Sequence, residues 1–248
     1  MTLSDAWLRG LSLLGFLVVW QIVAAIVSQP LLPTPIVVIT KLSHHAIYGE
    51  LLPNLGITLL RVTIAFVLAM AIGTAIGIAM GRSQGFDNIF DGVLVLGLNI
   101  PALVTIILCY IWFGLTEVAA VTAVALNKIP TVVVTVREGA RAVDRRLMEV
   151  AQVFRVKPLS TLTKVYLPQL YPYLMAAARS GLALIWKIVL VVELLGRSNG
   201  VGFQIGTFFQ FFDITGILAY TLAFATVILM FEAVCMRPLE ARLTRWRT

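Results

Sequence analysis

The sequence predicts an all-α, polytopic membrane protein with about six spanning helices. Hydrophobic residues make up 60% of the 248 residues and charged residues only 12%, about half the charged fraction of an average soluble domain. The apolar runs are continuous and lack the period-two alternation of a transmembrane barrel. A spanning helix needs roughly 20 apolar residues, so the chain has room for about six spans. We therefore treat residues 1–248 as a single transmembrane domain.

The apolar runs place the predicted elements in order along the chain. The first run is expected to be a span and not a cleaved signal peptide, because no small-residue cleavage site follows it. Pro35 suits the first position of a helix, so a short surface helix is expected at 35–47, within the outer segment 28–56. The spans are predicted at 10–27, 57–81, 92–112, 117–136, 171–195 and 215–236.

Basic residues predict the orientation of these spans. Seven of them lie in the segment 137–170 and four in the tail after residue 236, with Arg9 and Arg82 on the same side. The segments on the other side hold only Lys41 and Arg197. Since basic loops stay cytoplasmic, the segment 137–170 and both termini are expected in the cytoplasm. The net charge of +7 then reflects topology and contact with the lipid bilayer. Nucleic acid is not expected as a partner, because no basic soluble fold is present.

Cysteine and histidine give no indication of a metal site. Cys109 and Cys235 lie far apart in apolar segments, which favours buried, unpaired thiols. His44 and His45 are adjacent, so their side chains would point apart on a helix, and they are expected to be solvated.

Small residues recur at every fourth position of the second predicted span. Such a stripe allows another helix to approach closely. Its position leaves two roles open, which are tight packing within the bundle and lining of a translocation path. The stripe consists of Ala65, Ala69, Gly73, Gly77 and Gly81.

The segment 137–170 is predicted to form a cytoplasmic loop with two short helices. Residues 144–154 have helical composition, and Pro158 can open a second helix at its first position. From there Leu159, Leu162 and Val165 fall close to one face. An amphipathic helix of this kind fits a groove on a partner protein or lies on the membrane surface. Physical reasoning alone does not separate these two roles.

The spacing within this loop resembles the "EAA" loop of permeases of ATP-binding-cassette (ABC) importers, which reads Glu-Ala-Ala, three residues, Gly, nine residues, Ile-x-Leu-Pro. Glu149, Ala151, Leu167 and Pro168 match this pattern. Val150, Arg155 and Val165 replace its first Ala, its Gly and its Ile. Further stretches resemble the nitrate/sulfonate/taurine branch of the family, namely Leu60-Arg61, Gly81-Arg82-Ser83, Ile111–Gly114, Glu193–Gly196 and Gly200–Gly202.

The resemblance implies a type I importer permease that translocates a small substrate, expected to be an anion such as a sulfonate or nitrate. It implies a multi-pass protein of a bacterial inner membrane that works as two permease copies, expected to be a homodimer. Two ATPase subunits are expected to dock on the loop, and an external binding protein is expected to deliver the substrate. The chain contains no G-x-x-x-x-G-K-[ST] motif, so it is not expected to be an enzyme, and ATP and Mg²⁺ are expected on the ATPase. The alternative is a secondary transporter, which would show broken helices and often inverted repeats, and neither is apparent.

Arg155 stands where the family has glycine. A left-handed backbone costs a non-glycine residue roughly 1–2 kcal/mol. We therefore expect either a different turn or a helical φ at Arg155, with the bend then depending on Pro158.

Charged residues within the predicted spans are candidates for the translocation path. An ionised lysine at the bilayer centre costs at least about 2.5–3.5 kcal/mol unless water or a partner offsets it. Glu193 is the nearest acid to Lys187 but faces away from it on the same helix, so a pair would form across helices or subunits. Three readings stay open, which are a charged path lining, a buried structural ion pair and a misplaced span end. The candidates are Lys128, Arg179, Trp186, Lys187 and Glu193, of which Arg179, Trp186 and Glu193 share a face.

Overall fold

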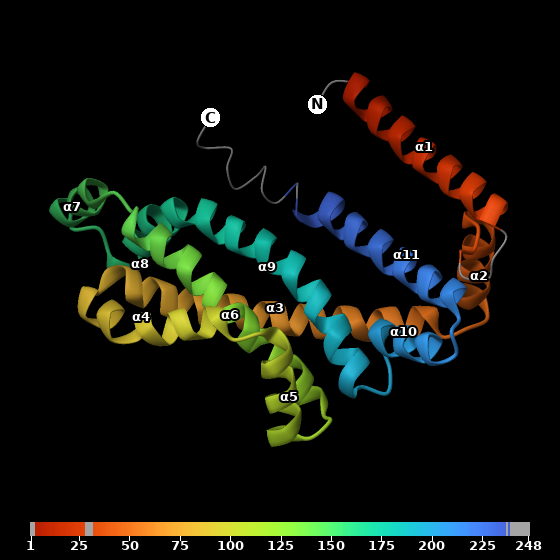
Figure 1. Cartoon of the computed structure of the whole chain (residues 1–248). Coiled ribbons are helices and arrows are strands. Elements are labelled where there is room, and N and C mark those ends of the chain that lie inside the picture. The colour runs from red at the N-terminus through yellow and green to blue at the C-terminus, as the bar shows by residue number, and fades with distance from the viewer. Residues whose placement is uncertain (1–2, 28–31, 237, 239–248) are drawn as a thin grey trace.

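The computed structural model describes residues 3–27, 32–236 and 238, and every regular element within them is a helix (Figure 1). The all-α fold is therefore confirmed. The elements are α1 (Leu3–Val27), α2 (Pro35–Ile47), α3 (Leu51–Arg82), α4 (Gln84–Asn99), α5 (Ala102–Phe113), α6 (Glu117–Arg141), α7 (Arg145–Val153), α8 (Pro158–Thr161), the π-helical turn η1 (Leu162–Tyr166), α9 (Leu167–Gly196), α10 (Val201–Gln210), α11 (Ile214–Phe231) and the π-helical turn η2 (Glu232–Met236).

Within the described residues, four segments are long and apolar enough to cross a membrane. These segments are Leu51–Arg82, Glu117–Arg141, Pro158–Gly196 and Ile214–Met236. The bent pair α4–α5 supplies a fifth crossing if it counts as one span, and the apolar part of α1, Leu14–Val27, is shorter. The surface helix predicted at 35–47 is α2, where Pro35 occupies the first turn and the Thr34 side chain accepts a hydrogen bond from the Val37 amide.

The prediction of one straight span over 92–112 is wrong. Helix α4 ends at Asn99, α5 begins at Ala102, and the two axes differ by 97°. The cause is Pro101, because a proline disfavours the helical region for the residue before it. Ile100 is accordingly extended, with φ −70° and ψ 122°. The prediction from average hydropathy missed the break because the residues on both sides of Pro101 are apolar.

The small-residue stripe of α3 faces α6, and the two helices run parallel with a constant register. A Cβ atom added to Gly73 would lie 2.7 Å from Val132 Cβ, and one added to Gly77 would lie 2.8 Å from Val136 Cβ. One added to Gly81 would lie 2.5 Å from Ala140 Cβ. Ala65 and Ala69 are fully buried on the same stripe. Glycine therefore sets how closely these two long helices approach.

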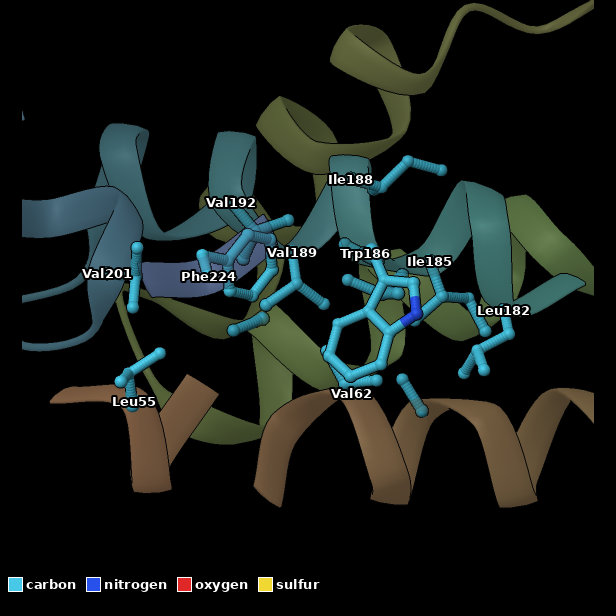
Figure 2. Packing of buried hydrophobic residues seen from close by; sticks show 14 of the residues in the cluster. Leu55, Val62, Leu182, Ile185, Trp186, Ile188, Val189, Val192, Val201 and Phe224 are labelled. Carbon is cyan, nitrogen blue, oxygen red and sulfur yellow. The ribbon is translucent and has the colours of Figure 1, made fainter. Parts of the chain in front are cut away.

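Helix α9 runs through the centre of the apolar core. Figure 2 shows its Trp186 and Val189 packed between Val62 of α3 and Phe224 of α11. The Trp186 and Phe224 rings meet edge to face, with centroids 5.6 Å apart. Because α9 contacts helices on several sides, its position fixes the arrangement of α3, α6 and α11.

Helix α2 is held against the corner between α10 and α11 by an ion pair and by ring contacts. Lys41 pairs with Asp213, and the Lys41 ammonium lies 5.6 Å from the Phe208 ring centroid. His45 packs edge to face against Phe208 and Tyr220, whereas His44 is exposed. Burial, with the neighbouring Lys41 charge, lowers the pKa of His45, so the neutral imidazole is favoured in this packing.

Replacing Gly77 with alanine is expected to separate α3 from α6, because the new methyl group would meet the Val133 carbonyl oxygen at 2.9 Å as well as Val136. Overpacking of this kind costs about 1–3 kcal/mol. The matched control is Gly56→Ala on the same helix, where nothing lies within 4 Å of the added carbon, and where alanine should be neutral or mildly stabilising. Thermal unfolding of the purified protein in detergent measures both. Equal stability of the two variants contradicts the close-packing role of Gly77.

Candidate functional site

Helix α7 is the outermost element at one end of the bundle, which we call the loop end (Figure 1). Asp144 caps it by accepting a hydrogen bond from the Arg146 amide, 2.8 Å. The Asp144 amide donates in turn to the Gln169 side chain at the start of α9, 2.9 Å. Ala151 faces inward and is 5% exposed, whereas Glu149 is exposed. Helix α7 is thus attached to α9 through its first residues and its inner face.

The outer side of α7 carries an unusual amount of apolar surface. Phe154 is 77% exposed, and Val153 is 79% exposed. Leu159, across the turn, is 73% exposed. Adjoining exposed apolar patches commonly mark an interaction site. We call the set consisting of Leu147, Val150, Val153, Phe154 and Leu159 the loop patch.

Both alternatives predicted for Arg155 are wrong, because Arg155 adopts a left-handed backbone with φ 49°. The Val156 amide donates to the Ala151 carbonyl (2.9 Å), and the Arg155 amide donates to the Gln152 carbonyl (3.0 Å). This is the Schellman arrangement, whose left-handed position normally holds glycine. The turn therefore keeps the geometry that glycine favours, at a cost of roughly 1–2 kcal/mol.

The second half of the loop is continuous with α9. Pro158 opens α8 at its first position, as predicted, but the π-helical turn joins α8 to α9, so that Pro158–Gly196 is one helical segment of 39 residues. The helical segment that carries the predicted span 171–195 therefore begins earlier than that span, at Pro158. A π-helical turn accommodates Pro168, which cannot donate a backbone hydrogen bond. Leu162 is 39% exposed, while Val165, Leu167 and Pro168 are half-buried.

A buried ion pair joins α3 and α9 near the opposite end of the bundle. Arg61 Nη1 lies 2.7 Å from Glu193 Oε1, and these side chains are 4% and 0% exposed. Arg61 also binds Glu117 at the start of α6 through two hydrogen bonds of 2.7 and 2.8 Å. A bidentate pairing of this kind is among the stronger charged contacts in proteins. One arginine therefore holds the ends of three spanning helices together.

The same carboxylate fixes the chain where α9 gives way to α10. Glu193 accepts hydrogen bonds from the Thr58 hydroxyl (3.0 Å) and the Gly202 amide (2.8 Å). Asn54 accepts from the Gly200 amide at 2.6 Å. Gly200 has φ 108°, a conformation that only glycine adopts readily. The turn that follows α9 is thus built around the buried Glu193.

Among the path candidates, Lys128 and Lys187 occupy opposite environments. Lys128 is 2% exposed, its ammonium has no hydrogen-bond partner, and its stem lies against Gly181 of α9. Lys187 is exposed on the outer face of α9. Glu193 pairs with Arg61 of another helix. Of the three predicted roles, a buried structural ion pair is therefore the one that matches the position of Glu193.

The predicted shared face of Arg179, Trp186 and Glu193 is only partly assembled. Arg179 pairs with Glu232 of η2 at 3.1 Å and lines a small hollow with Trp186. Trp186 is 4% exposed. Glu193 belongs to the separate network at the far end of the helix. Sequence reasoning did not identify Asn54, Thr58, Arg61 and Glu117 as parts of this network, although the charge of Arg61 within an apolar run was a usable signal. In the described part of the chain, no three His, Cys, Asp or Glu side chains could hold a metal ion together.

The sequence is similar to a family of transport proteins and to several transport permeases. Residues 69–237 match the family model described as "Binding-protein-dependent transport system inner membrane component". A putative aliphatic sulfonates transport permease protein of Bacillus subtilis is 32% identical over 97% of this chain and 88% of its own length. A taurine transport system permease protein of Escherichia coli is 28% identical over 93% and 86%. A nitrate import permease protein of Synechococcus elongatus is 24% identical over 77% and 72%.

Replacing Glu193 with glutamine is expected to destabilise the fold by about 2–4 kcal/mol, because Arg61 loses one of its two carboxylate partners in a buried site. The control is Glu138→Gln, since Glu138 is 52% exposed in its pairs with Arg137 and Arg141 and exposed pairs contribute little. Thermal unfolding of the two variants in detergent measures the difference. A Glu193→Gln protein as stable as Glu138→Gln would contradict the structural role of the pair.

Proposed function

Because this chain belongs to the family of inner membrane components of binding-protein-dependent transport systems, the permease subunits of ABC importers, we propose that its substrate is a small anion. The relatives named for aliphatic sulfonates, taurine and nitrate support this class. An external binding protein delivers the anion, and the permease carries it across the inner membrane. The single observation that carries the coupling part of the proposal is the exposed loop patch beside the matched Glu149 and Ala151.

The active transporter contains two copies of this chain, as a homodimer, and two ATPase subunits. ATP and Mg²⁺ bind to the ATPase, because this sequence lacks a phosphate-binding loop. Both termini and the loop end lie in the cytoplasm, as the distribution of basic residues favours. Within this assembly the chain is a transport subunit and not itself an enzyme.

Coupling runs from the loop patch through α9. ATP binding draws the two ATPases together and displaces α7, which is attached to α9 by the Asp144–Gln169 hydrogen bond. The continuous segment Pro158–Gly196 has 39 residues, which at about 1.5 Å per residue is roughly 58 Å. Its far end holds Glu193 in the network with Arg61. A displacement at the loop end therefore reaches the helix ends where α3, α6 and α9 meet, and alternating access results.

The anion path runs along the outer face of α9. Ala176, Ser180, Ala183 and Lys187 are exposed on this face. Lys187 lies nine residues before Gly196, or about 14 Å from that end of the helix. A lysine at such depth is tolerated when it faces water or the interior of an assembly and not lipid. The face thus offers small side chains and one positive charge to a passing anion.

The α4–α5 break is one feature that a secondary transporter would share. Asn99, Ile100 and Pro101 at that break bring no carboxylate. Such a transporter would work without an ATPase, and this difference decides the first test.

Replacing Phe154 with aspartate is expected to weaken association with the cognate ATPase roughly 30-fold or more, since loss of a central apolar anchor typically costs about 2 kcal/mol or more. The control is Phe211→Asp, because Phe154 and Phe211 are both 77% exposed and Phe211 lies at the opposite end. Co-purification and ATPase binding in nanodiscs measure the effect. Unchanged association of Phe154→Asp, with transport intact, rejects the loop patch as the docking surface.

Replacing Lys187 with methionine is expected to lower the transport rate of an anionic substrate about tenfold, while ATPase assembly stays intact, because the path loses its positive charge at depth. Lys187→Arg should retain most of the rate, and Leu184→Met, a neighbour on the exposed face, should not change it. Uptake into proteoliposomes containing the complete transporter provides the measurement. Normal transport by Lys187→Met removes this residue from the path.

A further inference from the structure

A hollow of about 570 Å³ adjoins the loop patch at Leu159 and lies between the end of α3, α7 and the α8–η1 segment. This volume falls within the usual range of small-molecule sites, about 300–1,000 Å³. More than half of its lining residues are apolar, namely Met148, Val156, Pro158, Leu159 and Leu162. None of the residues on the exposed face of α9 that we propose as the anion path lines this hollow.

Two polar side chains of the lining, Tyr166 and Arg82, lie together at one edge of this hollow. Tyr166 is 4% exposed, and its hydroxyl has no hydrogen-bond partner, although a buried hydroxyl normally has one. The Arg82 guanidinium lies over the Tyr166 ring, 5.5 Å from its centroid. No carboxylate in the described part of the chain forms an ion pair with Arg82. The lining thus brings the exposed Arg82 guanidinium next to the ring of Tyr166, whose buried hydroxyl lacks a partner. Gln152 and Thr161 are the other polar residues of the lining.

We propose that this hollow binds a small organic anion with a short aliphatic tail, such as an alkanesulfonate or a short carboxylate. The acidic group accepts a hydrogen bond from Arg82, and a second one from the Tyr166 hydroxyl once this side chain turns its buried hydroxyl toward the hollow. The tail lies against Met148 and Leu162. The positive charge of Arg82 disfavours cations. The apolar lining disfavours inorganic anions, which would lose their hydration without compensation.

The chemistry of the lining alone carries this inference, which does not depend on the substrate proposed for transport. The site also lies between the elements proposed to contact the ATPase. An anion bound there would bridge the end of α3, α7 and η1, on the side of the protein where the basic loop lies.

Isothermal titration of the full-length permease in phosphatidylcholine nanodiscs, with butane-1-sulfonate as the probe and without ATPase, tests the site. Arg82→Gln should weaken binding about tenfold or more, and Tyr166→Phe several-fold, because each removes a hydrogen bond to a charged group. Tyr171→Phe and Lys164→Gln are the matched controls, since neither residue lines the hollow. Sulfate, which lacks the tail, and butan-1-ol, which lacks the charge, should bind at least tenfold more weakly than the probe.

The path face could bind the same probe, so the Lys187→Met variant is titrated in parallel. Binding that survives in Lys187→Met and is lost in Arg82→Gln supports the inference. Binding that is absent in the wild type, or that Arg82→Gln and Tyr166→Phe leave unchanged, overturns it. Competition by phosphatidylglycerol added to the nanodiscs also overturns it, because the occupant is then a lipid headgroup. Since the ATPase takes no part, failure of the coupling proposal leaves this result interpretable.

Discussion

The fold depends on keeping one carboxylate and one guanidinium paired where neither can reach water. The side chains of Glu193 and Arg61 are 0% and 4% exposed, and an isolated charge in such surroundings is strongly unfavourable. Neighbouring groups satisfy both members of the pair. Thr58 and the Gly202 amide bind Glu193, while Glu117 binds Arg61. The meeting point of α3, α6 and α9 and the turn into α10 follow from this requirement, so a change in the relative position of these helices must break or rearrange charged contacts.

Close packing between α3 and α6 complements this charged network along the rest of their length. Glycines at 73, 77 and 81 bring the backbones together without polar contacts, which suits a bilayer because helix association there relies on van der Waals contact. The parallel register that the glycines set also places Arg61 beside Glu117. The network fixes the helices at one end, and the glycine stripe holds them together toward the loop end. Helix α9 packs against both α3 and α6.

The loop shows how a motif can lose its characteristic residue and keep its geometry. Arg155 occupies the left-handed position of a Schellman turn, where glycine would be unstrained. The two turn hydrogen bonds and the inward packing of Ala151 hold the turn in place. Propensity at a single residue gave the wrong expectation because neighbouring contacts outweighed a cost of roughly 1–2 kcal/mol. The helix break at Pro101 was missed for the opposite reason. Its signal was local and present in the sequence, but an average over apolar residues concealed it.

The sequence by itself determined the all-α membrane class, the surface helix beginning at Pro35, the two-part loop and the family. Each of these depends on composition, on periodicity or on residues close together in the chain. Only the tertiary structure decided that Glu193 pairs with Arg61, that Lys128 is buried against Gly181 and that Lys187 is exposed. The reason is physical. A charge inside an apolar run shows that the charge must be paired, solvated or left without a partner, but not which of these holds. Glu193 and Arg61 lie 132 residues apart in the chain, and only the packing of helices determines which charges meet.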